Sequence, residues 1–187
     1  MLVLVVNAGS SSLKAQLIQT DGKASLMKCL AEKVGTPQAF MNVSFAPDFE
    51  KVAVPVEGLS VPGCLRELLH VMVSNPGSPI ETLDAIDAVG NRIVAGGEYF
   101  CEATLVDDDA RAKLALCEEL APLHNPSADA CIDLQRELLP KTPQVAVFDT
   151  AFHQTMPPKA YMYPLPMRYY DDYRIRRYGA HGTSHRY

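Results

Sequence analysis

The sequence has no long hydrophobic run and no excess of positive charge, and each absence excludes a class of partner. No segment approaches the ~20 apolar residues of a membrane-spanning helix, and the apolar run at residues 2–6 lacks the basic region of a signal peptide. The net charge is −5 at pH 7, with an isoelectric point near 5.5, whereas non-specific nucleic-acid binding requires a basic surface. We therefore expect neither a membrane nor a nucleic acid as partner.

Paired cysteines and two common catalytic motifs are also missing. The five cysteines are odd in number, widely spaced and never form C-x-x-C, which is typical of reduced thiols in a cytoplasmic protein and not of a disulfide framework or a zinc site. His181 and His185 have a spacing that would suit a metal on a helix, but Gly182 and Thr183 between them disfavour a helix. Neither a Walker P-loop nor a G-x-S-x-G elbow occurs.

The composition and the hydrophobic periodicity predict a mixed α/β fold. The 187 residues are 48% hydrophobic and 21% charged, enough for a substantial core in one domain or a domain with an appendage. Strands come first and then alternate with helices, which indicates an α/β or α+β class with a mixed sheet. The expected strands are residues 2–7, 12–19, 26–33, 86–95 and 145–148, and residues 34–60 are expected to form irregular strands and loops.

Three helices are expected after residue 60. The first opens at Pro62 and turns Leu65, Leu68, Leu69 and Met72 to one face. The second follows residues 107–109 and includes Leu114, Leu116 and Leu120. Its three aspartates fit an N-cap and an acidic first turn better than a metal site. The third starts at Asn125-Pro126, where Asn125 is expected to act as the N-cap.

Residues 5–14 read VVNAGSSSLK and are the most informative stretch. A short apolar strand stops at Asn7, and Gly9 allows a turn where a Cβ would clash. If the chain leaves that turn extended, Ser10, Ser12 and Lys14 point to one side and offer hydroxyls and a cation to phosphate oxygens. A Ser-rich hairpin between two strands fits the same residues equally well.

Other polar clusters follow apolar strands, where ligands gather in α/β proteins. Arg92 ends one strand and has a guanidinium suited to a carboxylate, although a surface ion pair is the simpler alternative. Asp149 follows the strand 145–148 and fits a proton acceptor or metal-linked carboxylate, with a helix N-cap as the alternative. His124 fits either a donor to a bound anion or an ordinary histidine.

These clusters, in this order, resemble the acetate kinase family of the actin, Hsp70 and sugar kinase superfamily. Five blocks carry the resemblance: VVNAGSSSLK (5–14), Arg92 to Glu98, APLHNP (121–126), VAVFDTAFHQTMP (145–157) and RRYGAHGTSH (176–185). The match spans nearly the whole chain, and only residues 20–85 resemble the family weakly. The resemblance implies a ribonuclease H-like mixed sheet flanked by helices, as in actin-like ATPase domains. It also implies reversible, Mg²⁺-dependent phosphoryl transfer between ATP and acetate, giving acetyl phosphate and ADP, in a cytoplasmic homodimer.

The same resemblance implies roles for single residues. Asn7 would help to place Mg²⁺, and the nucleotide phosphates would contact Ser10, Ser12 and Lys14. Arg92 would bind the substrate carboxylate, with Val94 and Leu123 lining the pocket for its acyl chain. Asp149 would be the catalytic carboxylate, and the transferring phosphoryl group would accept hydrogen bonds from His124 and His181. These roles agree with the demand of phosphoryl transfer for positioned cations and donors.

Three departures from the family pattern qualify this assignment. Asn91 and Ala95 replace two histidines of the family's Gly-His-Arg-x-x-His-Gly-Gly pattern, which predicts a weaker carboxylate site. Ala180 stands where many relatives have Phe, so propionate is a rival substrate. The chain also lacks the family's second domain. Residues 1–150 would form the N-terminal domain and residues 151–187 a connection towards the missing one, so we expect negligible turnover from this chain alone; a non-catalytic binding module is the alternative.

Overall fold

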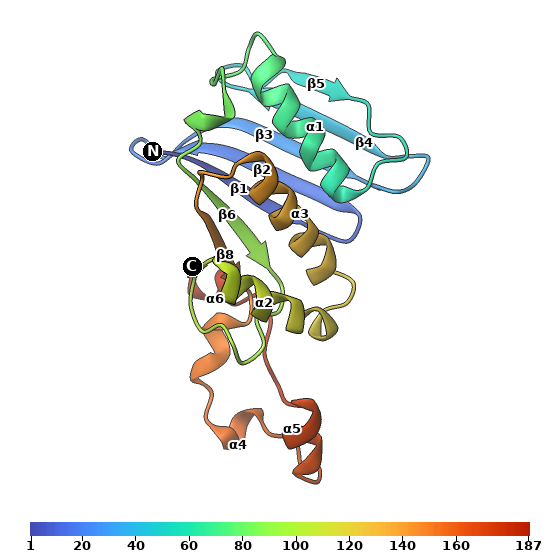
Figure 1. Cartoon of the computed structure of the whole chain (residues 1–187), viewed down its shortest axis with the longest axis vertical. Helices are drawn as coiled ribbons and strands as arrows, with labels where there is room; N and C mark the ends of the chain where they lie inside the picture. The colour runs from blue at the N-terminus through green and yellow to red at the C-terminus, as the bar shows by residue number, and fades with distance from the viewer.

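One mixed sheet of eight strands organises the computed structural model, which describes residues 1–187. The strands are β1 (Leu2–Ala8), β2 (Ser12–Gln19), β3 (Ala24–Glu32), β4 (Phe40–Phe45), β5 (Lys51–Val54), β6 (Ala88–Ile93), β7 (Thr104–Leu105) and β8 (Gln144–Phe148). Their order across the sheet is β5-β4-β3-β2-β1-β6-β8-β7. The first five strands pair antiparallel, whereas β1, β6 and β8 run parallel (Figure 1).

The strand expected at residues 12–19 is confirmed as β2, and its side chains alternate between buried and exposed. Leu13, Ala15 and Leu17 of β2 are buried, whereas Lys14 and Gln16 between them are exposed. Successive side chains of a strand point to opposite faces, so one face of the sheet is apolar and the other is polar.

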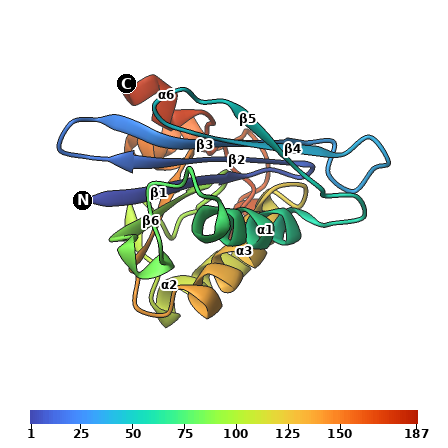
Figure 2. The ribbon, with the colours of Figure 1, turned by 90° about the horizontal axis from the view of Figure 1, so that it is seen from above.

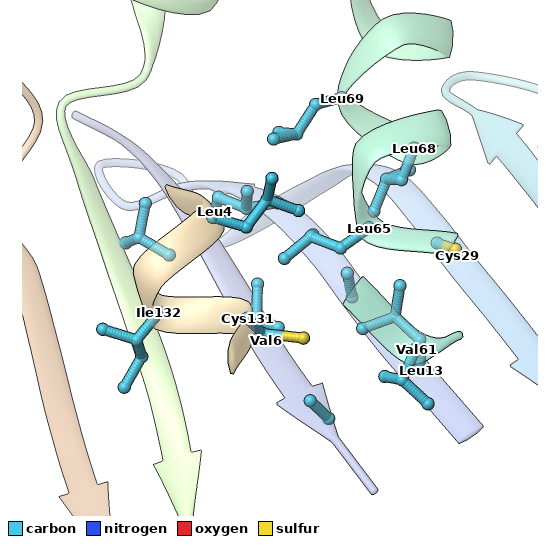
Figure 3. Close-up of a cluster of buried hydrophobic side chains, with 14 of the residues drawn as sticks. Leu4, Val6, Leu13, Cys29, Val61, Leu65, Leu68, Leu69, Cys131 and Ile132 are labelled. Carbon is cyan, nitrogen blue, oxygen red and sulfur yellow. The ribbon is translucent and has the colours of Figure 1, made fainter. Parts of the chain in front are cut away.

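Two long helices cover the apolar face. They are α1 (Val61–Ser74) and α3 (Asn125–Leu138), which lie on the same side of the sheet (Figure 2). The Ser60 side chain accepts a hydrogen bond from the Gly63 N–H and caps α1, and Pro62 lies in the first turn as expected. Figure 3 shows Leu65 of α1 and Ile132 of α3 in one core cluster with Leu4 and Val6 of β1.

Two of the segments expected from the sequence, residues 34–60 and the helix after residues 107–109, differ in part from the structure. Residues 34–60 contain the regular strands β4 and β5 and are not irregular throughout. The helix α2 (Asp108–Leu116) ends before Leu120, which lies in the short turn η2 (Glu118–Leu120). Leu116 comes only two residues after the buried Leu114, so it lies on the other side of the helix and is 62% exposed. The expected N-cap at Asp107 is confirmed, because its side chain accepts from the Ala110 N–H.

Residues 157–178 form an arm that extends away from the sheet (Figure 1). The arm follows the turn η3 (Ala151–Thr155) and holds two short helices, α4 (Pro158–Tyr161) and α5 (Arg168–Tyr173). The chain then returns to η3 and ends in α6 (Gly182–Arg186). Gly182 and Thr183 were expected to disfavour a helix, and this is wrong for residues 182–186, where tertiary contacts at Gly182 outweigh its low helix propensity.

No helix in the structure has both the length and the apolar character needed to cross a membrane. All five cysteines are free thiols, and four of them are buried.

Candidate active site

Arg92, Asp149 and Asn7 meet at one edge of the sheet. They come from β6, the end of β8 and β1, three parallel strands whose carboxyl ends lie side by side. The Arg92 guanidinium donates from Nε to Asp149 Oδ1 at 3.1 Å and from Nη2 to Asp149 Oδ2 at 2.6 Å. Its Nη1 donates to Asn7 Oδ1 at 3.3 Å. The two strand-end groups singled out in the sequence are therefore direct partners.

The buried Asp149 carboxylate holds the Arg92 guanidinium in place, and some N–H donors of the guanidinium stay free. The Asp149 side chain is 3% exposed and that of Arg92 is 38% exposed, so one partner is held in the protein and the other faces solvent. The hydrogen bond to Asp149 raises the pKa of Arg92. A guanidinium has five N–H donors and three are engaged here, which leaves two for an incoming anion.

The Ser-Lys turn adjoins this anchor. Gly9 closes the turn by donating from its N–H to the Ser12 carbonyl at 2.8 Å, and a Cβ at Gly9 would lie 2.8 Å from Ser12 Oγ. Lys14 pairs across the strands with Asn7, the acceptor from Arg92. Lys14 and Ser10 are both exposed. The cation of Lys14 and the guanidinium of Arg92 thus flank Asn7 on the same face of the sheet.

The loop after β6 is fixed by three side chains from elsewhere. Asn125 accepts from the Ala95 N–H at 3.2 Å and donates to the Ala95 carbonyl at 2.8 Å and the Cys117 carbonyl at 3.0 Å. Thr150 Oγ1 accepts from the Gly96 N–H at 3.0 Å, and Gln154 donates to the Gly97 carbonyl at 2.8 Å. These contacts set the course of the chain immediately after Arg92.

The expected N-cap role of Asn125 is wrong. Asn125 is the first residue of α3 and is fully buried, while His124 occupies the N-cap position without a side-chain capping bond. The amide binds the neighbouring loop because that loop has a buried N–H and carbonyl at Ala95 that need partners. Asn125 therefore ties the start of α3, which follows Leu123 and His124, to the loop that carries Val94.

Asn91 does not lie beside Arg92, in contrast to the sequence expectation. It points to the buried face of the sheet, where it donates to Gln144 Oε1 at 3.2 Å and accepts from Gln135 Nε2 at 3.0 Å. Adjacent residues of a strand face opposite sides, so a residue next to Arg92 in sequence cannot share its face. Asn91 is thus a residue of the core under α3 and does not belong to the face that carries Arg92.

Leu123 and His124 lie directly before α3, and Val94 lies in the loop after β6 that Asn125 binds. His124 and Leu123 are exposed, Leu123 by 73%, and Val94 is half-buried. The side chains expected to line an acyl pocket are therefore exposed at Leu123 and half-buried at Val94 in this chain.

The segment that carries His181 packs directly against Asp149. The Gly182 N–H donates to the Asp149 carbonyl at 2.8 Å, and a Cβ on Gly182 would come within 2.4 Å of that oxygen. His181 is in the left-handed region with φ of 52°, which is uncommon outside glycine. Its Nδ1 lies 4.0 Å from Asp149 Oδ2 and its side chain is 74% exposed. The site therefore presents His181 to solvent next to a buried carboxylate.

An ion pair that the sequence did not indicate fixes the base of the arm. Arg176 donates to Glu98 Oε1 at 2.7 Å, and the Tyr170 hydroxyl donates to the same oxygen at 2.8 Å. The Arg176 side chain is only 5% exposed and its guanidinium lies 3.6 Å from the centroid of the Tyr161 ring. Burial opposes ionisation of Glu98, but the hydrogen bonds from Tyr170 and Arg176 lower its pKa overall. Both residues lie inside the motif blocks, and only their distance in sequence hid the contact.

Comparison with known proteins places this geometry in a family. The Acetokinase family matches residues 2–187. An acetate kinase of Caldanaerobacter subterraneus subsp. tengcongensis is 46% identical over all of this chain and 46% of its own length. The structure superposes on Porphyromonas gingivalis acetate kinase with a TM-score of 0.90 and 40% identity, covering 100% of this chain and 46% of that one. A propionate kinase of Francisella tularensis gives 0.88 and 39%, with the same coverage.

The chain spans about half the length of the curated relatives it matches. The mixed sheet flanked by helices is the actin-like ATPase fold of these kinases, as the sequence predicts. A family match over nearly every residue, together with an Arg-Asp-Asn anchor built at the edge where the family motifs meet, shows that the chain belongs to the acetokinase family.

Proposed function

We propose that this chain is the acyl-anion and phosphate-binding half of an acetate kinase, which transfers a phosphoryl group reversibly between ATP and acetate. The observation that carries the proposal is the convergence of Arg92, Asp149 and Asn7, with Lys14 one strand away. Phosphoryl transfer depends on positioned charges and donors around a transition state with little covalent demand on the protein. An arginine held by a buried carboxylate is such a positioned charge.

Arg92 would bind the carboxylate of acetate with the two N–H donors that Asp149 and Asn7 leave free. Val94 and Leu123 would contact the methyl group, after a second part of the polypeptide closes over the exposed Leu123. Asp149 would hold Arg92 in position and act as the catalytic carboxylate. His124 and His181, whose side chains are both exposed, would donate hydrogen bonds to the oxygens of the transferring phosphoryl group.

Ser10, Ser12 and Lys14 would contact the phosphates of the nucleotide. Ser12 and Lys14 lie at the start of β2, where Lys14 pairs with Asn7 of β1, and Ser10 lies in the turn that precedes β2. Hydroxyl and ammonium donors are the usual partners of phosphate oxygens. The same face holds no carboxylate between Lys14 and Arg92 that would repel a polyanion.

The residues present fit a magnesium ion that arrives with the nucleotide. Mg²⁺ takes oxygen ligands, keeps several waters and binds one or two protein groups together with substrate phosphates. Asn7 Oδ1 and the Asp149 carboxylate are the oxygen groups at this edge, and no set of three or more His, Cys, Asp or Glu side chains that could hold a metal occurs in the chain. Asn7 would hold the ion, with Asp149 acting on its water shell. When bound, the ion would offset the negative charge of the phosphate oxygens.

The remaining assignments extend this proposal to the whole protein. Residues 1–150 would form the N-terminal domain and residues 151–187 the connection to a second one. The complete enzyme would be a cytoplasmic homodimer that uses ATP, Mg²⁺ and a short-chain carboxylate. The open site and the exposed His124 and His181 support negligible turnover by this chain alone, because water-excluded preorganisation is incomplete.

The proposal is tested with a chimera and with the chain itself. Residues 1–187 are joined to the unmatched half of the Caldanaerobacter acetate kinase, and hydroxamate formation from ATP and acetate is measured. We expect activity in the chimera, its loss in Arg92→Lys, and none in the isolated chain. Ordinary enzyme-like turnover by the chain alone would contradict the proposal that catalysis also requires a second domain.

A binding measurement keeps the test decisive if the chimera does not fold. Acetyl phosphate is titrated into the ¹⁵N-labelled chain, and we expect shifts at Arg92 Nε and at the amides of residues 94–97. Arg92→Lys should abolish them, whereas Arg66→Lys, which alters an exposed ion pair with Glu137, should not. Shifts elsewhere, or shifts that survive Arg92→Lys, would refute the proposed role of Arg92 in binding the acyl group and the phosphate.

Propionate is a second candidate substrate. The exposed Ala180 is small, and the propionate kinase of Francisella tularensis shares 39% identity with this chain. A methylene group in an apolar pocket changes specificity by only about 1–3 kcal/mol. Competition between acetate and propionate in the chimera decides between them. A non-catalytic binding module, the third reading, predicts no transfer to either acid although acetyl phosphate binds.

A further inference from the structure

The short turn η3, which begins soon after Asp149, contacts two separate loops of the candidate active site. On one side, Gln154 binds the loop after β6. On the other side, His153 Nε2 lies 2.9 Å from the carbonyl oxygen of Ala180, the residue that precedes His181. His153 therefore connects the end of β8, which leads to Asp149, with the segment that carries His181.

The hydrogen bond between His153 and Ala180 has only one possible direction. A carbonyl oxygen can only accept, so Nε2 of His153 carries the hydrogen and donates it. Both the charged ring and the neutral ring with its hydrogen on Nε2 can make this donation. His153 can therefore hold the Ala180 carbonyl in either protonation state.

Two hydrogen bonds fix the peptide groups on either side of His181. His153 holds the carbonyl of Ala180, which belongs to the peptide group before His181. The carbonyl of Asp149 accepts from the N–H of Gly182, in the peptide group after His181, at 2.8 Å. Each peptide group is planar, so the orientations of these two planes set the φ and ψ angles of His181. Both partners lie in the short segment directly after β8, which therefore determines the backbone of His181.

The backbone conformation held in this way is one that histidine rarely adopts. His181 has a φ of 52°, in the left-handed region where the Cβ of an L-residue is crowded. Such a conformation persists only where the surrounding structure over-determines it, and it is found most often at functional sites. With this backbone, His181 Nδ1 lies 4.0 Å from Asp149 Oδ2. A change of φ to the ordinary negative range would turn the Cα–Cβ bond of His181 to another direction.

The ring of His153 is packed tightly enough to fix the direction of its donor. Gly179 has a φ of 84°, and a Cβ at this position would overlap the His153 ring. The ring of His185 meets that of His153 edge-on, with the two centroids 5.6 Å apart. The His153 ring therefore lies between the backbone of Gly179 and the side chain of His185, and its Nε2 points to Ala180.

We propose that His153 is a positioning residue, whose hydrogen bond to Ala180 holds His181 in the left-handed conformation and so presents the His181 imidazole beside Asp149. The inference rests on the proposed function, in which His181 donates to the transferring phosphoryl group. His153 itself does not contact the reacting groups and acts only through Ala180 and His181.

The first test uses the 187-residue chain and does not depend on activity. His153→Phe keeps a ring against Gly179 but removes the donor, whereas His153→Gln offers an amide donor at similar reach. A positive φ brings the amide and α protons of a residue close together, which gives a strong nuclear Overhauser effect between them. We expect this strong effect at His181 in the wild type and in His153→Gln, and its loss in His153→Phe. His70→Phe makes the same change at an exposed position on α1 and should leave His181 unaltered.

The second test is a double-mutant cycle in the chimera of residues 1–187 with the Caldanaerobacter half. We expect His153→Phe to lower kcat about tenfold or more while KM for acetate changes by less than about twofold, because a displaced donor weakens binding of the transition state and not of acetate. His153→Gln should restore most of the kcat. Because His153 acts only through His181, the variant with both His153→Phe and His181→Ala should have the same kcat as His181→Ala alone.

The two tests distinguish failure of this inference from failure of the proposed function. A folded but inactive wild-type chimera would contradict the proposed function, and the NMR comparison would still decide whether His153 holds His181. A strong effect at His181 that persists in His153→Phe, or that is lost in His153→Gln, would overturn the inference. Losses of kcat that multiply in the double variant would also overturn it, because His153 would then act on another group. If circular dichroism shows that His153→Phe does not fold, His153→Met, which also lacks a donor, replaces it.

Discussion

Arg92 is held by side chains from two other strands, so its orientation depends on residues that are far away in the sequence. Asp149 is the more buried partner and engages both Nε and Nη2. Removing one charge of a buried, hydrogen-bonded pair costs more than removing one from a pair at the surface, because the remaining group keeps its desolvation penalty.

Asp149→Asn is expected to lower the free energy of unfolding by about 1–3 kcal/mol. The reason is the loss of a two-point, charge-assisted contact with Arg92. Urea unfolding of the chain measures it. Asp21→Asn, which removes an ion pair with the N-terminus whose partners are 66% and 79% exposed, should change stability by under about 1 kcal/mol. Equal effects of the two substitutions would contradict the anchor role of Asp149.

Asn125→Ala is expected to cost about 2–4 kcal/mol, because three buried backbone groups lose their partner at once. The amides of Ala95 and Gly96 should also exchange faster with solvent. Asn75→Ala, which removes a single exposed bond to the Gly77 N–H, serves as the control and should cost about 1 kcal/mol or less. Unchanged exchange at residues 95–97 would show that Asn125 does not position this loop.

The helix α3 is the element that joins the core to the site. Its first turn binds the loop after β6 through Asn125, and its middle carries Asp129 and Asp133 beside Arg111 of α2. Asp129 is 1% exposed, and burial raises its pKa to about 6 although Arg111 acts in the opposite direction. Asp133 is half-exposed, and the hydrogen bond from Arg111 lowers its pKa. Ionisation of Asp129 therefore destabilises the folded protein, whereas ionisation of Asp133 stabilises it.

We expect Asp129→Asn and Asp133→Asn to change the pH dependence of stability in opposite directions. The pKa of Asp129 in the folded protein lies above the unfolded value of 3.8, so ionisation of Asp129 destabilises the protein as pH rises from about 4 to 6. Over that window the free energy of unfolding of Asp129→Asn should rise relative to that of the wild type by up to about 3 kcal/mol. A lowered pKa makes Asp133 contribute above about pH 4 and lose that contribution in acid, so Asp133→Asn should lose relative stability as pH rises through that region. Urea unfolding at pH 3–7 measures both, and parallel curves would contradict the assignment.

Local patterns predicted most of these elements and few of their contacts. The alternation of apolar residues in β2 and the apolar stripe of α1 were sufficient to predict these two elements, because one face of each is buried. The orientation of Asn91, the role of Asn125 and the Glu98–Arg176 pair were missed, since each depends on a partner more than 25 residues away. The helix α6 was missed because the fit of Gly182 against Asp149 is a tertiary contact.

At the scale of the whole molecule, the sheet and the arm differ in how they are supported. The sheet has a continuous core of buried residues beneath α1 and α3. The arm contains only short helices, and its tip exposes Leu165 by 51% and Met167 by 55%. Segments with little buried surface open at lower free energy than core strands.

Brief digestion with trypsin is therefore expected to cut first in the arm, after Lys159 or Arg168. Lys28 and Lys51 are exposed too, but their backbone is fixed in the sheet and should be cut later. Mass spectrometry of the first fragments checks this order. A first cut at Lys28 would show that the open face of the sheet is the weaker region.

The distribution of thiols gives this chain a single natural attachment point for a reporter group. Burial raises the pKa of Cys29 and Cys131 to about 12 and that of Cys117 to about 11, and Cys64 is also buried. Cys101 alone is exposed, and it borders a small hollow of about 120 Å³ together with Gly182 and Thr183. A maleimide dye should attach there without any mutation, and its fluorescence would follow the segment next to His181 as an anion binds.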